Sequence, residues 1–597
     1  MAPTPTSTGS AAASSDAAGG TGDGLPSHWR IRRPAEEDVT DLVRALRVPE
    51  ILARLLVNRG HTTHDDVGSI LTPSLHALND PKGLPDLEEA AVRLRRAIDA
   101  GETVLVHGDY DVDGVSGTVL LVRFLRHLGG KVEWHIPHRT RDGYSFGDHS
   151  VRKAREVGAS VVVSVDNGTS AVEPIAALAD EGVDVIVTDH HEPPEGELPR
   201  AFALVNPKLA TSTYPFRELC GTAVAFKLAW RICQLESGDE RVRPDLREFL
   251  LEALAYVAIA TICDVVPLVG ENRVLAHFGL RSIAEAPAPG LHALLDRTGL
   301  AGRALTAEDV AFQIGPRINA SGRMDSAARA VETLLASDAP EGRRCAERLE
   351  VLNDERRQVE RGVVEEAYAQ AEERSATDPI LVLASEGWHP GVVGIVASRI
   401  VDRFGRPALV IGVDEHGVGR GSARSVQGVD LLPILRGGAD HMRRFGGHAM
   451  AAGCEVDASE IDGLREALVR SASSLPKADD VAPIDIDAVV DLAGFDGSLM
   501  GQLGRLEPYG ERNPKPVLLA RDVRLDDMPR VMGKTGEHLM LQVRSGATVH
   551  KAVAFGFAKR EHELRMSRPI DLVFTPRLNH WRGRTEIQLV VADFDCR

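Results

Sequence analysis

Residues 102–114 read ETVLVHGDYDVDG, an apolar β-branched run that predicts a buried strand, followed directly by a histidine and three aspartates. Four of its polar residues are spaced by two, so their side chains would face one way if the chain stayed extended. They are His107, Asp109, Asp111 and Asp113. Converging carboxylates repel one another in a buried place, and a divalent cation would remove that conflict. The alternative is that they cap the helix expected after Gly114, which would explain one aspartate more easily than three.

Outward from this stretch, β-branched runs alternate with helical patterns, expected near residues 115–128 and 171–181, as far as residue 207. Such alternation predicts βαβ units, a parallel sheet and helices on both of its faces. In open sheets of this kind, ligands bind beyond the carboxyl ends of the strands. Two further predicted strands end in polar residues: SVDNG contributes Asp166, and VTDHHE contributes Asp189, His190 and His191.

A last carboxylate, Asp264, follows a long apolar helix, where a charged side chain needs a partner. Alone, Asp166 or Asp264 would be interpreted as a turn residue or a cap. Together with the first motif they make a set of six or seven oxygen and imidazole ligands. This set suits Mn²⁺, Zn²⁺ or Fe, and Mg²⁺ where carboxylates dominate. It is large enough for two ions, the arrangement that clamps the attacking and leaving oxygens in phosphoester hydrolysis.

The remaining sequence predicts several further domains. Residues 271–375 are mainly helical and end in a long charged helix, which we expect to be a solvated connector. A second α/β pattern follows, and the last part of the chain has short alternating strands that predict a small β-barrel or sandwich. The expected organisation is a disordered tail (1–27), an N-terminal helical segment (28–100), the parallel-sheet domain (101–270), the helical region (271–375), a smaller α/β domain (376–475) and the β-domain (485–597).

The amino-acid composition limits the classes of function that this chain can have. A hydrophobic content of 43% excludes a wholly disordered chain, and no apolar run is long enough for a membrane span. The six scattered cysteines, with no C-x-x-C pair, favour reduced thiols and a cytoplasmic location. The net charge of −18 argues against a nucleic-acid partner. That charge is uneven, however, because residues 395–453 carry +3 (8 basic, 5 acidic) and residues 517–597 carry +4 (14 basic, 10 acidic).

Several motifs resemble those of known nucleases. HGDYDVDG, SVDNG and TDHH resemble the successive motifs of the DHH phosphoesterase superfamily. Later motifs narrow the resemblance to the RecJ family of bacterial single-strand-specific 5′→3′ DNA exonucleases, which act in DNA repair and recombination. These motifs are GPRINASGRMDSA (315–327), GWHPGVVGIVASRI (387–400), GRGSARS (419–425), GGHAMAAG (446–453) and PYGERNPKP (508–516).

The resemblance implies a fold and a cofactor. It implies a DHH domain, a linking helix, a DHHA1 domain and a C-terminal OB-fold, with two divalent ions, Mn²⁺ first and Mg²⁺ as the alternative. The implied ligands are Asp111, Asp113, Asp166, His190 and Asp264, with Asp109 beside them, His107 ligating or supporting, and His191 nearer the phosphate. The residues expected to carry catalysis are Asp111, Asp113, Asp166, His190, His191 and Asp264.

The substrate-binding residues are expected in three of the later motifs. Gly446, Gly447 and His448 could cradle a phosphate, although a Gly-Gly-His stretch is also an ordinary hairpin turn. Arg420, Ser422 and Arg424 offer donors to backbone phosphate, with a solvated strand edge as the alternative. Arg317, Asn319 and Arg323 are expected along the nucleic-acid path, or else paired with acidic residues of the connector.

The β-domain carries aromatic residues that could stack on bases, beside Arg582 and Arg584. They are Phe555, Phe557, His580 and Trp581, and core packing is their alternative role. The expected partner is single-stranded DNA, and the resemblance adds a single-strand-binding protein and a RecQ-type helicase; the chain is expected to be a monomer. Two rival functions remain: a DHH phosphodiesterase for short oligonucleotides or cyclic dinucleotides, and a non-catalytic DNA-binding scaffold that has lost its metal ligands.

Overall fold

The computed structural model describes residues 25–139, 141–142, 146–285, 288–375, 377–473, 483–533, 536–581 and 584–596. They divide into two compact units. The larger unit comprises residues 68–480 and 505–515, and the smaller unit comprises residues 1–67, 481–504 and 516–597. The predicted disordered tail lies outside the described residues, except for its last three positions. Within the described part, no helix is both long and apolar enough to cross a membrane.

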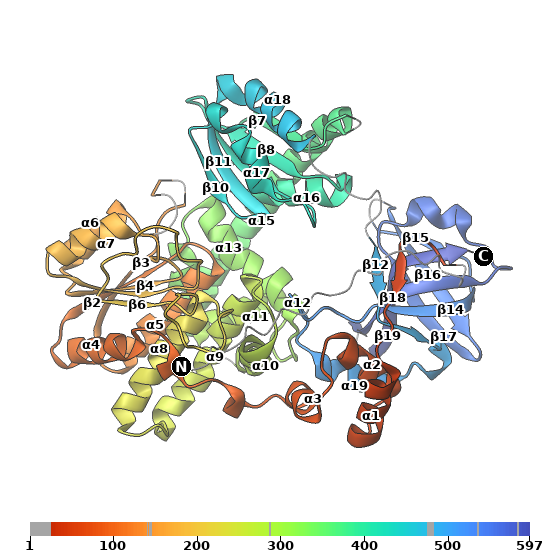
Figure 1. The fold of residues 1–597 in the computed structure, drawn as a ribbon, viewed down its shortest axis with the longest axis horizontal. Coiled ribbons are helices and arrows are strands. Elements are labelled where there is room, and N and C mark those ends of the chain that lie inside the picture. The colour runs from red at the N-terminus through yellow and green to blue at the C-terminus, as the bar shows by residue number, and fades with distance from the viewer. Residues whose placement is uncertain are drawn as a thin grey trace, which may run out of the picture. The chain divides into compact units, whose positions relative to one another are not determined.

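The predicted parallel sheet is formed by the first strands of the larger unit (Figure 1). Its strands follow the order β3-β2-β4-β5-β6, and every neighbouring pair is parallel. The strands are β2 (Thr103–Gly108), β3 (Lys131–His135), β4 (Val161–Val165), β5 (Asp184–Thr188) and β6 (Ala203–Val205). Because parallel strands end at the same edge, the polar residues after β2, β4 and β5 are brought to one place.

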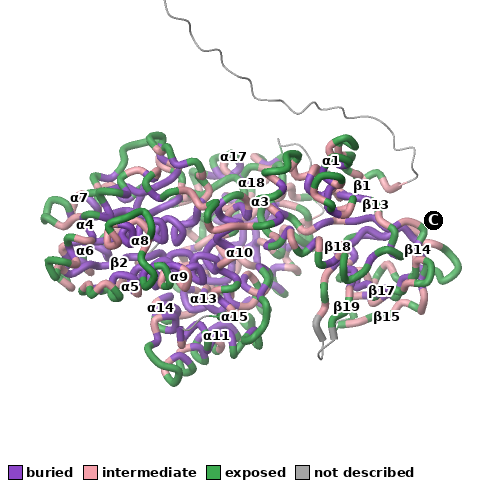
Figure 2. The backbone as a smooth tube through the Cα atoms, turned by 90° about the horizontal axis from the view of Figure 1, so that it is seen from below, coloured by how far each residue is buried: buried purple, intermediate pink, exposed green. Residues whose placement is uncertain are grey.

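Helices cover both faces of this sheet, as the strand sequences require. Val104 and Val106 of β2 pack into one apolar core, while Leu105 between them packs into another on the opposite face. The first core takes in helices α4 (Leu87–Asp99), α5 (Val112–His127), α8 (Gly221–Ser237) and α9 (Pro244–Cys263). The second is closed by α6 (Asp148–Val157) and α7 (Val172–Asp180). Strand β2 is buried along its whole length (Figure 2).

The helical region links this domain to a second sheet. Helices α10 (Gly270–Ala284), α11 (Pro289–Thr298), α13 (Gly315–Met324) and α14 (Ala328–Leu334) precede the 36-residue helix α15 (Ala339–Arg374). The prediction that α15 is a solvated connector is wrong in part. Leu349 near its start belongs to the first core, and Val363 and Ala367 belong to the core of the second domain. A stripe of apolar residues therefore anchors the helix at both ends.

The second domain of the larger unit has a mixed sheet in the order β10-β11-β9-β8-β7. Only β7 and β8 are parallel, and the other pairs are antiparallel. The strands are β7 (Leu381–Glu386), β8 (Ala408–Val413), β9 (Val418–Arg424), β10 (Arg444–Gly447) and β11 (Ala451–Asp457). Helix α16 (Val393–Phe404) packs on one face with α15, and α17 (Leu431–Arg436) and α18 (Ile461–Ala472) pack on the other.

The smaller unit contains the predicted barrel. Five strands in the order β14-β18-β19-β17-β16 close on themselves because β14 also pairs with β16. They are β14 (Leu518–Leu525), β16 (His538–Ser545), β17 (Thr548–Ala554), β18 (Ile570–Trp581) and β19 (Arg584–Cys596), with β13 (Ala488–Val490) and β15 (Arg530–Met532) at the margins. The predicted fold class, an α/β chain ending in a closed β-barrel, is confirmed.

The N-terminal segment differs from its prediction. Strand β1 (Trp29–Ile31) pairs in parallel with β12 (Ile484–Ile486), and the Trp29 indole donates a hydrogen bond of 2.8 Å to Asp593. Helices α1 (Glu36–Leu46) and α2 (Glu50–Asn58) belong to the same smaller unit. The expected helical segment 28–100 is therefore divided at residue 67 between the two units. Local sequence patterns do not report a pairing between residues so far apart in the chain.

The motif at residues 508–516 also departs from its predicted domain. Residues 505–515 belong to the larger unit, although the residues on either side belong to the smaller one. The Arg273 guanidinium donates hydrogen bonds of 2.9 Å to the carbonyl oxygens of Arg505 and Glu507. The Leu268 amide donates another, of 2.8 Å, to the Glu511 carbonyl. These contacts attach the motif to the larger unit through its backbone.

Candidate metal centre

The first motif turns sharply where an extended chain was expected. Strand β2 ends at Gly108, and helix α5 begins at Val112. Asp111 is the N-cap of that helix and accepts hydrogen bonds from the amides of Asp113 (2.9 Å) and Gly114 (3.2 Å). A Cβ atom at Gly114 would lie 2.3 Å from the Asp109 amide nitrogen, so only glycine permits this turn. The predicted extended spacing is wrong, and the capping alternative holds for Asp111.

The turn nevertheless brings the predicted carboxylates together with the other strand ends. His190 is central: its Nε2 atom lies 3.1 Å from Asp166, 3.5 Å from Asp264 and 3.8 Å from Asp113. Three overlapping groups have ligand atoms within 4.8 Å of one another, and each group could hold a metal ion. They are Asp109 with Asp111 and Asp166; Asp166 with His190 and His191; and Asp113 with His190 and Asp264.

Helix α8 fixes Asp113 in this cluster. The carboxylate accepts hydrogen bonds of 2.7 Å from the amides of Gly221 and Thr222, the first residues of that helix. A helix N-terminus carries partial positive charge and so favours an anion there. Asp166 packs against the same turn with φ of 64°, and a Cβ at Gly221 would lie 2.6 Å from its Cβ. Gly221 is thus required by the close approach of two ligands.

Asp189 supports the two histidines, a role that the sequence interpretation did not assign to it. Its Oδ1 atom accepts hydrogen bonds from the amides of His190 (2.7 Å) and His191 (3.1 Å) and lies 2.8 Å from His191 Nδ1. Burial alone would raise the pKa of Asp189, but its hydrogen bond with His191 and nearby charge lower it overall. Burial likewise opposes protonation of His191, yet Asp189 raises the pKa of that imidazole to about 9.

The carboxylates of the cluster are poorly compensated by protein groups. Burial, followed by the charge of neighbouring aspartates, raises the pKa of Asp109, Asp166 and Asp264 well above the ordinary range. Asp109 is fully buried, and within the described structure neither of its carboxylate oxygens accepts a hydrogen bond. Buried carboxylates without donors are costly. The residues present therefore fit divalent cations, and a mixed oxygen and imidazole set suits Mn²⁺ or Mg²⁺.

His107 is placed differently from its prediction. It is not in any of the three carboxylate groups; its ligand atoms gather instead with those of His135 and His149. The strand direction explains this result, because β2 still runs straight at His107 and the chain turns only after Gly108. Its side chain points to the face covered by α6, where Nε2 lies 2.8 Å from the Ser150 hydroxyl.

The raised pKa values predict how pH affects the stability of the protein in chelator. A carboxylate whose folded pKa is raised keeps its proton in the native state at pH values where the unfolded chain has already lost it. Stability therefore falls as pH rises from about 4 towards the folded pKa values. A divalent cation binds the ionised cluster, so the increase in melting temperature caused by Mn²⁺ or Mg²⁺ should grow with pH over this window. Thermal unfolding with and without EDTA measures this; a shift that is independent of pH would contradict it.

Three arginines form a second cluster beside the first motif. Burial, then the charges of Arg139, Arg356 and Arg424, lower the pKa of Arg323 to about 10. Burial and Arg139 also lower the pKa of Arg424. Among the described residues, no carboxylate pairs with Arg139, Arg323 or Arg424. A Cβ at Gly322 would lie 3.0 Å from the Tyr110 carbonyl, so α13, which carries Arg323, packs closely against the first motif.

Arg139 is the member of this arginine cluster that the sequence interpretation missed. It follows β3 in a loop, and its guanidinium lies 5.0 Å from the centre of the Tyr110 ring. The stretch IPHR directly after a predicted strand could have indicated it, because the other site residues also follow strands. Three neighbouring guanidinium groups without carboxylate partners form a site for an anion.

Other predicted substrate residues have structural partners. Arg317 is buried and makes hydrogen bonds of 2.5 and 2.9 Å to the Glu350 carboxylate on α15. This is the pairing with the connector that was the alternative. Asn319, which lies on α13 like Arg317, is half-buried. Arg420 and Ser422 lie on β9, where the Arg424 guanidinium donates a hydrogen bond of 3.1 Å to the Ser422 hydroxyl.

The Gly-Gly-His motif forms the hairpin that was its alternative. Gly446 and Gly447 end β10, opposite Gly453 and Ala452 of β11. Gly447 has φ of 143°, and a Cβ there would lie 2.5 Å from the Ala451 carbonyl oxygen. The His448 amide donates a hydrogen bond of 2.8 Å to that oxygen, and the His448 side chain is exposed.

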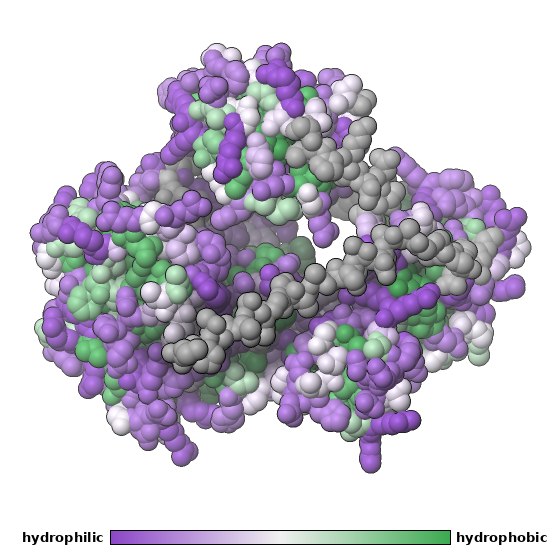
Figure 3. All heavy atoms as spheres, in the orientation of Figure 1, coloured by the Kyte–Doolittle hydropathy of each residue, from purple (hydrophilic) through white to green (hydrophobic). Residues whose placement is uncertain are grey.

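The aromatic residues of the barrel separate into two kinds. Phe555 is 47% exposed and meets His538 edge-on, with ring centres 5.3 Å apart. Phe557 packs against Phe594 at 5.7 Å, so core packing accounts for it. The side chains of His580, Trp581 and Arg584, and all of Arg582, lie outside the described part of the chain. On the face seen in Figure 3, hydrophilic residues dominate and apolar ones form small groups.

Comparisons with known proteins agree with this architecture. Residues 103–259 match the DHH family N-terminal domain, residues 377–474 the DHHA1 domain, and residues 486–593 the RecJ OB domain. A single-stranded-DNA-specific exonuclease RecJ from Bacillus subtilis is 35% identical over 95% of this chain and 70% of its own length. A crystal structure of Thermus thermophilus RecJ with Mn²⁺ matches 95% of this chain and 79% of that one, with TM-score 0.80 and 30% identity. The Mg²⁺ complex of the same protein matches with TM-score 0.74 and 29% identity, covering 95% and 78%.

Proposed function

The chain belongs to the RecJ family of single-stranded-DNA-specific exonucleases, and from this premise we propose that it removes nucleotides from the 5′ end of single-stranded DNA, using divalent cations held by the carboxylate cluster. The observation that carries the proposal is the meeting of two uncompensated clusters. Asp109, a buried aspartate whose carboxylate accepts no hydrogen bond in the described structure, interacts electrostatically with Arg139, one of three neighbouring arginines for which the described residues offer no carboxylate partner. A divalent cation satisfies the first group, and a phosphate satisfies the second.

The cluster residues have distinct roles in this proposal. Asp109, Asp111, Asp113, Asp166, His190 and Asp264 hold two divalent ions, Mn²⁺ first and Mg²⁺ as the alternative. When bound, such ions activate water and neutralise charge on the leaving oxygen. Helix α8 and Asp189 keep the ligands oriented, because their hydrogen bonds fix Asp113 and the two histidines. His191 keeps its proton through Asp189 and presents Nε2 to the scissile phosphate.

The arginine cluster selects the end of the strand. A terminal phosphomonoester carries nearly two negative charges, while each internal phosphodiester carries one. Arg139, Arg323 and Arg424 together offer more positive charge than one internal phosphate needs, so a 5′-terminal phosphate is their best occupant. Binding that phosphate beside the metal ligands places the first phosphodiester at the centre.

The barrel contributes contacts to the rest of the strand. A closed five-stranded barrel with an exposed Phe555 and a local excess of basic residues suits stacking and backbone charge along single-stranded DNA. A phosphodiesterase for dinucleotides would not need this domain, and a non-catalytic scaffold would not retain every metal ligand. A single-strand-binding protein, a RecQ-type helicase and a monomeric state remain predictions from the family resemblance.

The proposal is tested with strands of equal sequence labelled at the 5′ or the 3′ end. With Mn²⁺ or Mg²⁺, we expect the 5′-labelled single strand to release its label first as a mononucleotide, and duplex DNA to survive. EDTA should stop the reaction. Label released first from the 3′ end would overturn the polarity. A higher kcat/KM on a dinucleotide than on a long strand would favour the short-oligonucleotide phosphodiesterase instead.

A further inference from the structure

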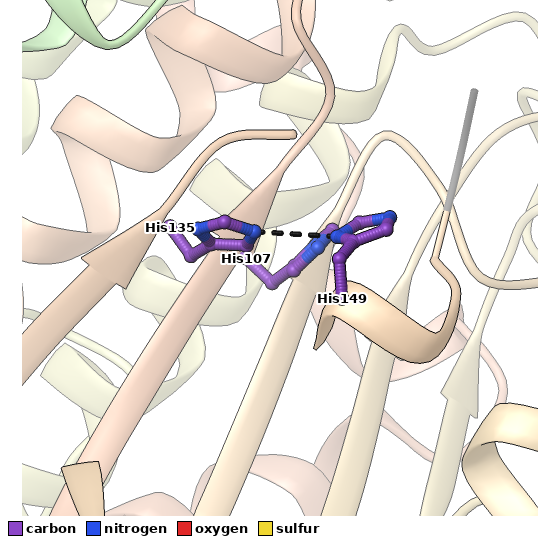
Figure 4. Close-up of side chains that lie close together, drawn as sticks. All are labelled: His107, His135 and His149. Atoms are coloured by element: carbon purple, nitrogen blue, oxygen red, sulfur yellow. Dashed lines mark hydrogen bonds between the residues drawn. The ribbon is translucent and has the colours of Figure 1, made fainter. Parts of the chain in front are cut away.

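A second group of metal-ligating side chains lies behind the carboxylate centre. His107 ends β2, His135 ends β3, and His149 lies in the first turn of α6 (Figure 4). Their ligand atoms lie within 4.8 Å of one another, and their ring centres are 5.3–5.5 Å apart. No residue of this group belongs to any of the three carboxylate groups.

We propose that His107, His135 and His149 bind one transition-metal ion of the Zn²⁺ class, at a site separate from the carboxylate centre. Three imidazoles with no carboxylate among them are a nitrogen donor set, which favours Zn²⁺ and disfavours the oxygen-seeking Mg²⁺. A fourth position would be open to water or to the Ser150 hydroxyl. The inference does not depend on the proposed nuclease function.

The distance between two of the ligand nitrogens fits a tetrahedral ion. Zn–N bonds of about 2.0–2.1 Å in tetrahedral geometry place neighbouring nitrogens roughly 3.3 Å apart. His135 Nε2 and His149 Nδ1 are 3.2 Å apart, the contact drawn dashed in Figure 4. Within the same pocket, the Ser150 hydroxyl lies 2.8 Å from His107 Nε2 and 3.4 Å from His149 Nδ1. That hydroxyl already accepts the Gly147 amide, and it has only one proton to donate to the two rings.

The surroundings also suit a cation. His107 is fully buried, and His149 is 8% exposed, so the rings are held in place by packing against Phe146 and α6. Burial, followed by the charge of His149, lowers the pKa of His135 to about 4, which leaves that ring neutral and able to ligate. The Asp142 carboxylate interacts electrostatically with both His135 and His149 and supplies negative charge nearby.

The site would join three elements at one point. A bound ion would tie the carboxyl ends of β2 and β3 to the start of α6. His135 and His149 lie on either side of the segment that carries Arg139, so the ion would hold both ends of that segment. The expected effect is structural support for Arg139, with no part in the chemistry.

The test uses the full-length protein, stripped with chelator, loaded with excess Zn²⁺ in the presence of Mg²⁺, and desalted before metal analysis. We expect His135→Gln and His149→Gln each to hold one zinc ion fewer per chain than the wild type, with affinity for that ion reduced by more than about tenfold. His277→Gln, a half-buried histidine on α10, is the matched control and should keep the ion. Zinc should raise the melting temperature of the wild type and of the control more than that of the two variants.

Equal zinc content in the wild type, His135→Gln and His149→Gln would overturn the proposal, as would an equal loss in His277→Gln. If the two variants do not fold, the visible absorption spectrum of Co²⁺-loaded wild-type protein tests the proposal instead. Intense visible absorption bands of a tetrahedral nitrogen-ligated ion would support the site, and only the weak bands of six-coordinate Co²⁺ would overturn it.

Discussion

Asp111→Asn should reduce kcat/KM on single-stranded DNA by at least about a thousandfold while leaving the protein folded. Lewis-acid stabilisation by a bound ion supplies several kcal/mol, and each 1.4 kcal/mol is a factor of ten in rate. Asparagine is as good an N-cap as aspartate, so the hydrogen bonds to the amides of Asp113 and Gly114 can persist. Loss of activity would then report loss of ligation and not loss of helix α5.

The melting temperature of Asp111→Asn gives a second measurement. Removing one charge relieves the repulsion that raises the pKa of Asp166 and Asp264, so in EDTA the variant should melt at or above the wild-type temperature. The gain in melting temperature from Mn²⁺ should shrink. Asp338→Asn, at the N-cap of α15, is the matched control and should keep activity and metal response. Near-normal Mn²⁺-dependent degradation by Asp111→Asn would remove Asp111 from the centre.

Arg424→Gln should abolish the preference for a 5′-phosphorylated strand. A charge-assisted hydrogen bond contributes about 1.5–3 kcal/mol, so KM for the phosphorylated strand should rise by roughly 10- to 150-fold. KM for the same strand with a 5′-hydroxyl should change little, because that end does not use the arginine cluster. The Arg424 guanidinium also donates hydrogen bonds to the Ser422 hydroxyl and the Ala423 carbonyl, so a melting curve of Arg424→Gln should accompany the kinetic measurement.

Arg443→Gln is the control for this substitution, because Arg443 lies on the same domain but forms ion pairs with Glu455 and Asp457. It should leave both KM values unchanged. Arg139→Gln should reproduce the effect of Arg424→Gln, since the two guanidinium groups share the cluster. Equal rises in KM for the phosphorylated and the hydroxyl strand would assign Arg424 to general backbone binding.

Much of the centre could be predicted because its ligands follow strands. Apolar β-branched runs predict β2, β4 and β5, and parallel strands must end at one edge, so Asp166 and His190 were expected near the first motif. Alone, Asp264 would be interpreted as a turn residue or a cap, because a lone carboxylate after a helix has many ordinary explanations. Its burial among other aspartates, visible only in three dimensions, gives it a role.

Predictions from local sequence patterns were wrong or incomplete where the chain turns or where a side chain has a partner far away in the sequence. Spacing by two predicted that His107 faces the carboxylates, but the chain turns after Gly108 and sends them to different sides. Arg317 was expected either on the DNA path or paired with an acidic residue of the connector, and the structure shows the pairing, with Glu350, 33 positions later. Neither the turn after Gly108 nor the identity of this partner follows from the residues near the motif.

By itself, the sequence determined the parallel sheet, the all-β character of the last domain and most of the candidate metal ligands, because periodic burial and strand ends are local properties of the chain. Only the tertiary structure decided which polar groups are compensated. It joined Arg139, Arg323 and Arg424 with no acidic partner among the described residues, gathered His107 with His135 and His149, and paired β1 with β12. Charge compensation depends on distances of a few ångströms between residues far apart in the chain, and no local pattern encodes those distances.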